Sequence, residues 1–314
     1  MANLLLRSPQ YKETSAVGML SANIDVSIDS ILRYSITKNA INNVVVFDIS
    51  EISRDYIEHT FGQSNPSETI AISTTITQYT GLNGTGTATA LSPVSDVGYD
   101  GYGEFSEGIN PKISTSQRPL QSNTDIYLPP STASYIPVNY GDGSFETSAA
   151  ATDGTKYYIP SPSDPQYTFT IRTICDTKFG STKVTFVNKF GALQEMYFFF
   201  KQQETVNVTS ENYKSNLVTN TDPATYSTTK HQVSTYNVNA KETISLNTPF
   251  VTDNYNLALE QLLLSEHIWL TKDGTTYPIA PKTKSLQKKT NVNDKLVQYT
   301  MEFEYAFDKI NNVR

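Results

Sequence analysis

The sequence predicts a mainly β protein with an antiparallel β-sandwich-like core, a long loop insertion and a small C-terminal α/β element. Of its 314 residues, 38% are hydrophobic and 18% are charged, whereas soluble domains typically have about 45–50% and about 25%. Thr, Ser and Asn fill the difference, and the chain carries 20 Tyr and 14 Phe. Thr and aromatic residues suit pleated, half-buried surfaces, and period-two alternation recurs along the chain.

The first 80 residues read as a set of strands. Residues 23–31 (NIDVSIDSI) and 69–80 (TIAISTTITQYT) alternate apolar and polar side chains, which indicates half-buried strands. Residues 44–49 (VVVFDI) form an apolar run with polar boundaries, which predicts a fully buried strand. Ser50 is a plausible helix N-cap, so residues 50–59 are predicted to form one short helix.

Residues 81–165 differ in character, because Gly, Pro, Ser, Asn and Asp dominate while tyrosines recur. A disordered segment would be poor in aromatic residues. A long loop inside a compact domain is usually functional or contacts a partner. We therefore expect an ordered inserted arm that makes subunit contacts. Its candidate interface residues are Tyr99, Tyr102, Tyr127, Tyr135, Tyr140, Tyr157 and Tyr158.

Strand patterns return after residue 165. The most apolar run of the chain, residues 196–200 (MYFFF), predicts a central strand, and residues 216–230 form a loop rich in Thr and Asn. Further strands are predicted at residues 167–171, 183–191, 204–208 and 236–246. These strands are expected to form a single β-sandwich core, residues 1–80 plus 166–250, into which residues 81–165 are inserted.

Residues 251–314 are predicted to close that core with a helix, a hairpin and a strand. Tyr255, Leu259, Leu262 and Leu263 recur at i, i+4, i+7 and i+8, which is the pattern of an amphipathic helix. Asp273-Gly274 is a hairpin turn signal between two apolar runs. The final strand then places alternate residues on one face: Tyr299, Met301, Phe303, Tyr305 and Phe307.

Composition and motifs argue against several chemistries. The net charge of −7 disfavours direct nucleic-acid binding, which needs clustered Lys and Arg. The single Cys175 excludes an intrachain disulfide and a multi-cysteine zinc site. His59, His231 and His267 lie far apart in sequence, so no metal or cofactor is expected. No G-x-S-x-G motif occurs, and no apolar run approaches the roughly 18 residues of a membrane span.

Acidic residues gather in the loop at residues 96–107. Asp96, Asp100, Glu104 and Glu107 accompany two tyrosines on Gly-rich turns, where oxygen ligands could hold calcium or polar groups could bind a glycan. The spacing does not match an EF-hand loop, and a solvated acidic loop is the favoured interpretation. Whether this loop binds calcium or glycan stays open at this point.

Two segments carry a resemblance to a known class of proteins. Residues 184–194 (VTFVNKFGALQ) run from a strand through Asn-Lys-Phe-Gly into an aromatic-rich strand. This pattern resembles tail and baseplate structural proteins of phages. The ending, residues 293–314 (NDKLVQYTMEFEYAFDKINNVR), is similar to C-termini of proteins in tailed phages of Bacteroidetes hosts. The resemblance covers residues 165–314 and implies a role in the virion, in the distal tail, baseplate or neck.

Three functions remain to be compared. The first is a structural subunit of a phage tail, baseplate or connector, which acts by ring-forming contacts with copies of itself, six-fold by analogy, and with other virion proteins. Such a protein is assembled in the host cytoplasm and has no membrane or catalytic role. The second is a receptor- or glycan-binding module of a tail fibre or adhesin, although no repeat is visible. The third is a tail-associated glycan hydrolase, although no convergent acids can be read from the sequence.

Overall fold

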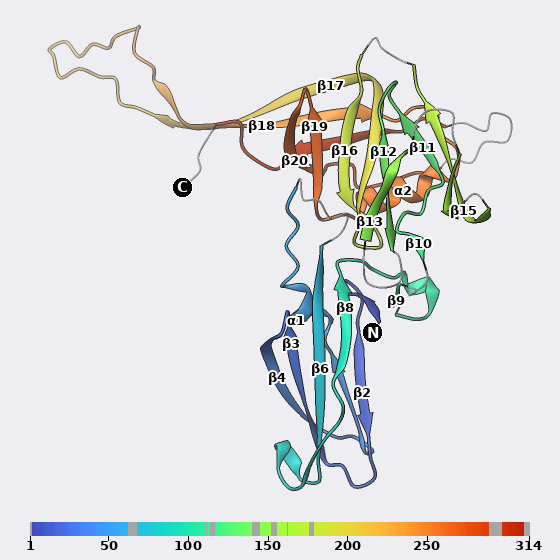
Figure 1. Ribbon diagram of the computed structural model, residues 1–314. Coiled ribbons are helices and arrows are strands. Elements are labelled where there is room, and N and C mark those ends of the chain that lie inside the picture. Colours follow the sequence, from blue (N-terminus) through green and yellow to red (C-terminus); the bar gives the residue numbers. More distant parts are fainter. Residues whose placement is uncertain are drawn as a thin grey trace.

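The computed structural model describes residues 2–61, 68–110, 112–113, 117–139, 145–151, 156–161, 163–175, 179–288 and 297–310. Strands account for 54% and helices for 7% of the protein, which confirms the predicted mainly β fold. Figure 1 shows two lobes and a long projecting hairpin. We call residues 2–113 the N-terminal lobe and residues 117–310 the barrel lobe.

The N-terminal lobe is built on a seven-stranded sheet with the order β4-β3-β6-β8-β1-β9, in which β7 pairs with β6. Its strands are β1 (Asn3–Leu5), β3 (Ser21–Ile28), β4 (Ile31–Asn39), β6 (Thr69–Tyr79), β7 (Ala88–Ala90), β8 (Val94–Tyr99) and β9 (Lys112–Ile113). A two-stranded sheet of β2 (Tyr11–Ser15) and β5 (Val44–Asp48) packs its buried side chains into the same core. Short helical segments are α1 (Ser50–Arg54), η1 (Leu82–Gly84) and η2 (Phe105–Glu107).

Strand β5 corrects one expectation from the sequence. The run 44–49 was expected to form a fully buried strand, but only alternate side chains of β5 are buried. Val45 and Phe47 enter the core, while Val44 and Val46 are exposed. The reason is that β5 belongs to a two-stranded sheet, which covers the core with one face and leaves the other in solvent.

The barrel lobe contains a closed barrel with the order β16-β17-β18-β21-β20-β19. Its strands are β16 (Thr182–Val187), β17 (Leu193–Lys214), β18 (Val233–Asn247), β19 (Ile268–Lys272), β20 (Thr275–Pro281) and β21 (Thr300–Tyr305). Two three-stranded sheets accompany the barrel, β10-β12-β13 and β11-β15-β14. They comprise β10 (Arg118–Pro119), β11 (Asp125–Leu128), β12 (Ser134–Asn139), β13 (Phe145–Ala151), β14 (Lys156–Ser161) and β15 (Asp164–Thr173).

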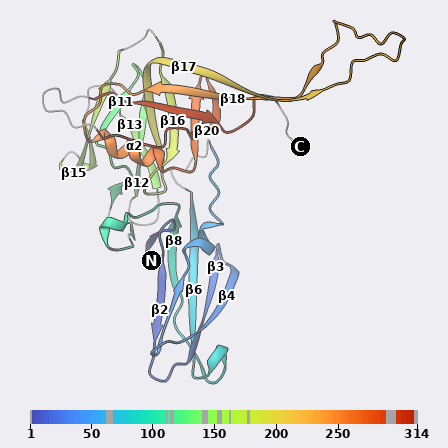
Figure 2. The same ribbon diagram turned by 180° about the vertical axis from the view of Figure 1, so that it is seen from behind.

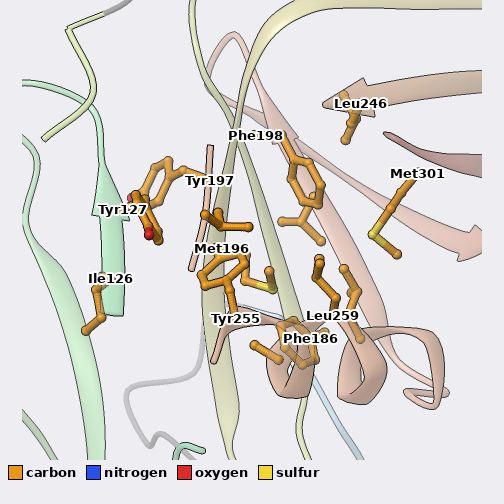
Figure 3. Packing of buried hydrophobic residues seen from close by; sticks show 14 of the residues in the cluster. Ile126, Tyr127, Phe186, Met196, Tyr197, Phe198, Leu246, Tyr255, Leu259 and Met301 are labelled. Carbon is orange, nitrogen blue, oxygen red and sulfur yellow. The ribbon is translucent and has the colours of Figure 1, made fainter. Parts of the chain in front are cut away.

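One hydrophobic cluster joins the barrel, β11 and the helix α2 (Tyr255–Leu263). Figure 3 shows Tyr255 and Leu259 of α2 beside Phe186 and Met196 of the barrel. Tyr127 of β11 packs edge-to-face on Tyr255, with ring centroids 5.2 Å apart. The helix therefore buries its apolar face against the barrel, as the spacing of its apolar residues predicts.

The C-terminal element has the predicted form. Helix α2 spans the expected residues, and β19 and β20 form a hairpin whose turn residues Asp273 and Gly274 have φ values of 50° and 78°. Positive φ at both central positions is what a type I′ hairpin requires. Strand β21 pairs with β18 on one side and β20 on the other, so it closes the barrel.

The sheets group the chain differently from the expected division into a 1–80 plus 166–250 core and an 81–165 insertion. Strands before residue 80 pair with β7, β8 and β9, whereas the strands from residue 182 close a separate barrel. Each group has its own hydrophobic cluster. The sequence pattern did not predict strand β8, because the strand is short and contains Gly98, and glycine is uncommon in strands. In the structure, a Cβ at Gly98 would lie 2.7 Å from the side chain of Leu6.

Candidate assembly interface

A two-stranded ribbon extends from the barrel lobe. Going from the barrel towards the tip of the ribbon, Thr243 is the last residue of β18 that pairs with both neighbouring strands. It pairs with Thr205 of β17 and Glu304 of β21. Beyond it, residues 206–242 form a hairpin with no third strand in the described part of the chain. We call residues 206–242 the arm. Figures 1 and 2 show it projecting away from both lobes.

The arm has one apolar and one polar face. Directly paired residues of an antiparallel ribbon share a face, as do residues two apart in a strand. Val206 and Val208 of β17 therefore lie on the same face as Val238, which pairs with Ser210. The opposite face carries Asn207, Thr209 and their partners Lys241 and Asn239.

The apolar face of the arm is open to solvent. Val206, Val208 and Val238 are 47%, 64% and 45% exposed, whereas Ala240 on the same face is buried. Further out, the half-exposed rings of Tyr213 and Tyr236 contact each other on the opposite face. A lone two-stranded hairpin is marginally stable in water. An amphipathic ribbon with an uncovered apolar face therefore has the properties of a surface that another protein covers.

The tip of the arm is held together by neutral groups. At the tip, the Thr219 hydroxyl donates to the carbonyl oxygen of Thr225 at 2.8 Å, and the Ser215 hydroxyl donates to that of His231 at 2.9 Å. The expected Thr/Asn-rich loop at residues 216–230 is thus this tip. The arm also exposes Tyr213, Tyr226 and Tyr236, and tyrosine is enriched at protein interfaces.

The predicted interface tyrosines do not gather on one surface. Tyr99 and Tyr127 are buried inside the chain, so the prediction is wrong for these two. The backbone N–H of Thr252 donates to the Tyr127 hydroxyl at 3.1 Å, and Arg7 lies over the half-buried Tyr102 ring. Tyr135 is exposed on β12, and Tyr157 and Tyr158 are half-buried on β14. Tyr140 lies outside the described residues.

The four carboxylates of the acidic loop each have a basic partner. Asp96 and Asp100 are 3% exposed, so the expectation of a solvated loop is wrong for them. Asp96 pairs with Lys12, and Glu104 and Glu107 both pair with Lys189 of the barrel lobe. Because basic side chains already neutralise these carboxylates, the loop does not present a ready set of calcium ligands.

Asp100 lies at a junction between the lobes. The Arg54 guanidinium donates to Asp100 Oδ1 at 2.6 Å, and it also contacts Glu266 of the barrel lobe. His59 Nε2 lies 2.9 Å from Asp100 Oδ2, and the rings of His59 and His267 have centroids 4.8 Å apart. The sequence contained no sign of this convergence, because the docking of two lobes creates it.

Contacts at the junction shift the pKa values of Asp100 and His267. Burial alone would raise the pKa of Asp100, but the hydrogen bonds from His59 and Arg54 outweigh it and hold this pKa below its ordinary value. Burial, with the neighbouring His59, lowers the pKa of His267. Asp100 is therefore an ionised carboxylate and His267 a neutral imidazole near neutral pH.

Comparisons with family models, curated proteins and solved structures found no match to this chain. Within the described ranges, no helix is both long and apolar enough to cross a membrane.

Proposed function

We propose that this chain is a structural subunit that assembles with copies of itself into a ring, as a component of a phage tail, baseplate or connector. The observation that carries the proposal is the arm, a projecting ribbon of residues 206–242 that exposes Val206, Val208 and Val238 on one face.

A second copy is the partner that fits the arm best. Each subunit carries one arm, and each also has a free sheet edge, since no described strand pairs with the outer side of β4. That edge begins with Ile31 and Leu32, which are both exposed. If the arm of one copy binds the β4 edge of the next, the same contact repeats from copy to copy. Such head-to-tail contacts close into a ring when the rotation between neighbouring copies divides a full turn.

The phage context is supported by the resemblance of residues 184–194 and 293–314 to tail and baseplate proteins. In the fold, the first segment is β16, its Asn-Lys-Phe-Gly turn and the start of β17, which leads into the arm. The second contains β21, which closes the barrel that anchors the arm. Both segments thus support the element proposed to make the contacts.

The test is to remove the arm while keeping its base. Residues 209–239 are replaced by Asn-Gly, which joins the directly paired Val208 and Ala240 by a two-residue hairpin turn. We expect a folded monomer where the full chain forms an oligomer, as measured by sedimentation velocity. Electron microscopy of the full chain should show the ring.

A matched pair of substitutions makes the test independent of the deletion. Val208→Asp places a charge on the apolar face, and Asn207→Asp places the same charge on the polar face. We expect the first to abolish assembly and the second to retain it. A full chain that stays monomeric at high concentration, or assembly that survives the loss of the arm, would contradict the proposal.

A cavity at the tip of the arm favours glycan binding as a second candidate function. It measures about 520 Å³, within the usual range for ligand sites, and Tyr226, Asn216 and Lys230 are among its lining residues. Aromatic and amide side chains of this kind suit sugars. Binding to a glycan array that is lost in Tyr226→Ala would support this candidate.

A further inference from the structure

Two histidine rings lie next to each other at the junction between the lobes. His59 follows α1 in the N-terminal lobe, and His267 precedes β19 in the barrel lobe. Their ring centroids lie 4.8 Å apart, the His59 side chain is only 2% exposed, and His267 is half-buried. A positive charge on one ring would therefore act on the other through little water, where electrostatic forces are strong.

We propose that this histidine pair is a pH-sensitive latch, which keeps the junction closed near neutral pH and opens it when His267 takes up a proton. Each lobe contributes one ring, so repulsion between the rings acts between the lobes. The inference concerns contacts within one chain, and it does not rest on the proposed assembly role. We refer to His59 and His267 as the latch.

The charged groups around the latch are balanced when His267 is neutral. Arg54 of α1 donates to Asp100, which directly follows β8, and also pairs with Glu266. Arg7, in the segment after β1, pairs with the same glutamate. In the described part of the chain, two cations around the latch thus match two carboxylates. An additional positive charge on His267 would have no carboxylate of its own.

Burial and charge both oppose a proton on His267. Burial is the largest effect that lowers the pKa of His267 below its ordinary value, and the neighbouring His59 and Arg54 lower it further. Asp100 and Glu266 attract the proton, but they do not outweigh these effects, since both already pair with Arg54. The closed junction therefore favours the neutral ring.

Contacts on both sides hold the two rings in place. His59 Nε2 lies 2.9 Å from Asp100 Oδ2, and this nitrogen carries the N–H because an ionised carboxylate can only accept. The His267 ring stacks on Trp269, and the backbone N–H of Val187 donates to the His267 carbonyl oxygen. Neither ring can turn away without breaking such a contact, so repulsion between the rings is relieved by movement of the lobes.

A second contact between the lobes is apolar. Leu5 and Tyr99 of the N-terminal lobe share one buried cluster with Leu120 and Ala192 of the barrel lobe. The lobes therefore stay connected when the latch opens, and they change their relative orientation. The arm belongs to the barrel lobe and β4 to the N-terminal lobe, so the latch also determines how the arm and the β4 edge are placed relative to each other.

Opening of the junction changes how tightly His267 holds a proton. In solvent the pKa of a histidine has its ordinary value of about 6.5, so the open state binds the proton more tightly than the closed state. The closed state is therefore fully stable above about pH 6.5 and loses stability as the pH falls below it. Asp100 does not contribute in this range, because its hydrogen bonds hold its pKa below the ordinary value.

The only tryptophan of the chain provides the first readout. Trp269 lies beside His267, and Phe61 of the N-terminal lobe packs against it with ring centroids 5.9 Å apart. Opening of the junction removes Phe61 and exposes the indole to water. The fluorescence emission of the full chain should therefore shift to longer wavelength between about pH 7 and about pH 5. His267→Gln should remove this shift, whereas His231→Gln, the matched control on the exposed arm, should retain it.

Energy transfer between two fluorophores shows whether the lobes move. The native Cys175 is exposed in the barrel lobe, and Val17→Cys adds a second exposed site in the N-terminal lobe. Labelled chains are diluted into an excess of unlabelled chains, so that transfer within one chain is measured. We expect the transfer efficiency to change below about pH 6.5 in this labelled chain and to stay constant when His267→Gln is added.

Circular dichroism at neutral pH confirms that each variant is folded before the titration. Glutamine is close to histidine in size and His267 is half-buried, so His267→Gln is expected to fold. A transfer efficiency that stays constant in the labelled chain with His267 in place would overturn the proposal without any need for that variant. So would an emission shift of equal size in the full chain and in His267→Gln.

Discussion

Replacing Phe303 by Asp is expected to lower the free energy of unfolding by at least about 4 kcal/mol. Phe303 is fully buried in β21, pairs with Ile244 of β18 and Pro281 of β20, and meets the Phe198 ring edge-to-face at 6.1 Å. The change removes a large apolar side chain and puts a charge where the barrel closes. Denaturant unfolding followed by circular dichroism measures the effect.

Phe105→Asp is the matched control for this prediction. Phe105 lies in η2 and is fully exposed, so the same substitution should change the free energy of unfolding by less than about 0.5 kcal/mol. If Phe303→Asp were as stable as the control, β21 would not be needed to close the barrel.

Asn188→Ala is expected to destabilise the protein by about 2–4 kcal/mol. Asn188 is fully buried at the turn between β16 and β17. Its Nδ2 donates to the Leu120 carbonyl oxygen at 2.6 Å, and its Oδ1 accepts from the backbone N–H groups of Phe190 and Ala192. Alanine leaves these partners buried and unsatisfied.

The same denaturant measurement on Asn207→Ala provides the comparison, because Asn207 is exposed on the polar face of the arm. That variant should stay within about 0.5 kcal/mol of the unchanged protein. Equal stability of the two variants would mean that the Asn-Lys-Phe-Gly turn does not depend on the side chain of Asn188.

Features governed by local patterns could be predicted from the sequence. The apolar spacing of α2 and the Asp273-Gly274 turn each depend on a few neighbouring residues, and both have the expected form. The run 196–200 does form part of a strand, β17, whose residues 196–199 pair with β16 or β18 in the barrel. Local propensity and tertiary structure agree at these places.

The arm could not be predicted, because its exposure is a property of the whole fold. Polar alternation in residues 204–208 and 236–246 is typical of any half-buried strand. Within the described ranges, only the absence of a third strand beyond Thr243 separates the arm from the barrel wall. The sequence reading divided β17 into two strands where Phe200 adopts a φ of 64° and the pairing shifts.

The burial of two tyrosines and the proximity of two histidines could not be predicted for a related reason. Tyr99 and Tyr127 stand among turn-forming residues, which suggested a surface, yet β8 and β11 carry them into the cores. His59 and His267 have no common local pattern, since they meet only when two lobes pack together. Long-range contacts of this kind leave no periodic sign in a single sequence.

The closure of the barrel has a consequence for how the chain folds as it is synthesised. All strands of the N-terminal sheet have been translated once residue 113 has left the ribosome, so that lobe can fold early. The barrel must wait for β21, which lies between β18 and β20 and is translated after both. Until then the base of the arm, at the β18 residues 243–247, lacks β21 as its neighbouring strand. We therefore expect the barrel to hold the arm in place only at the end of translation.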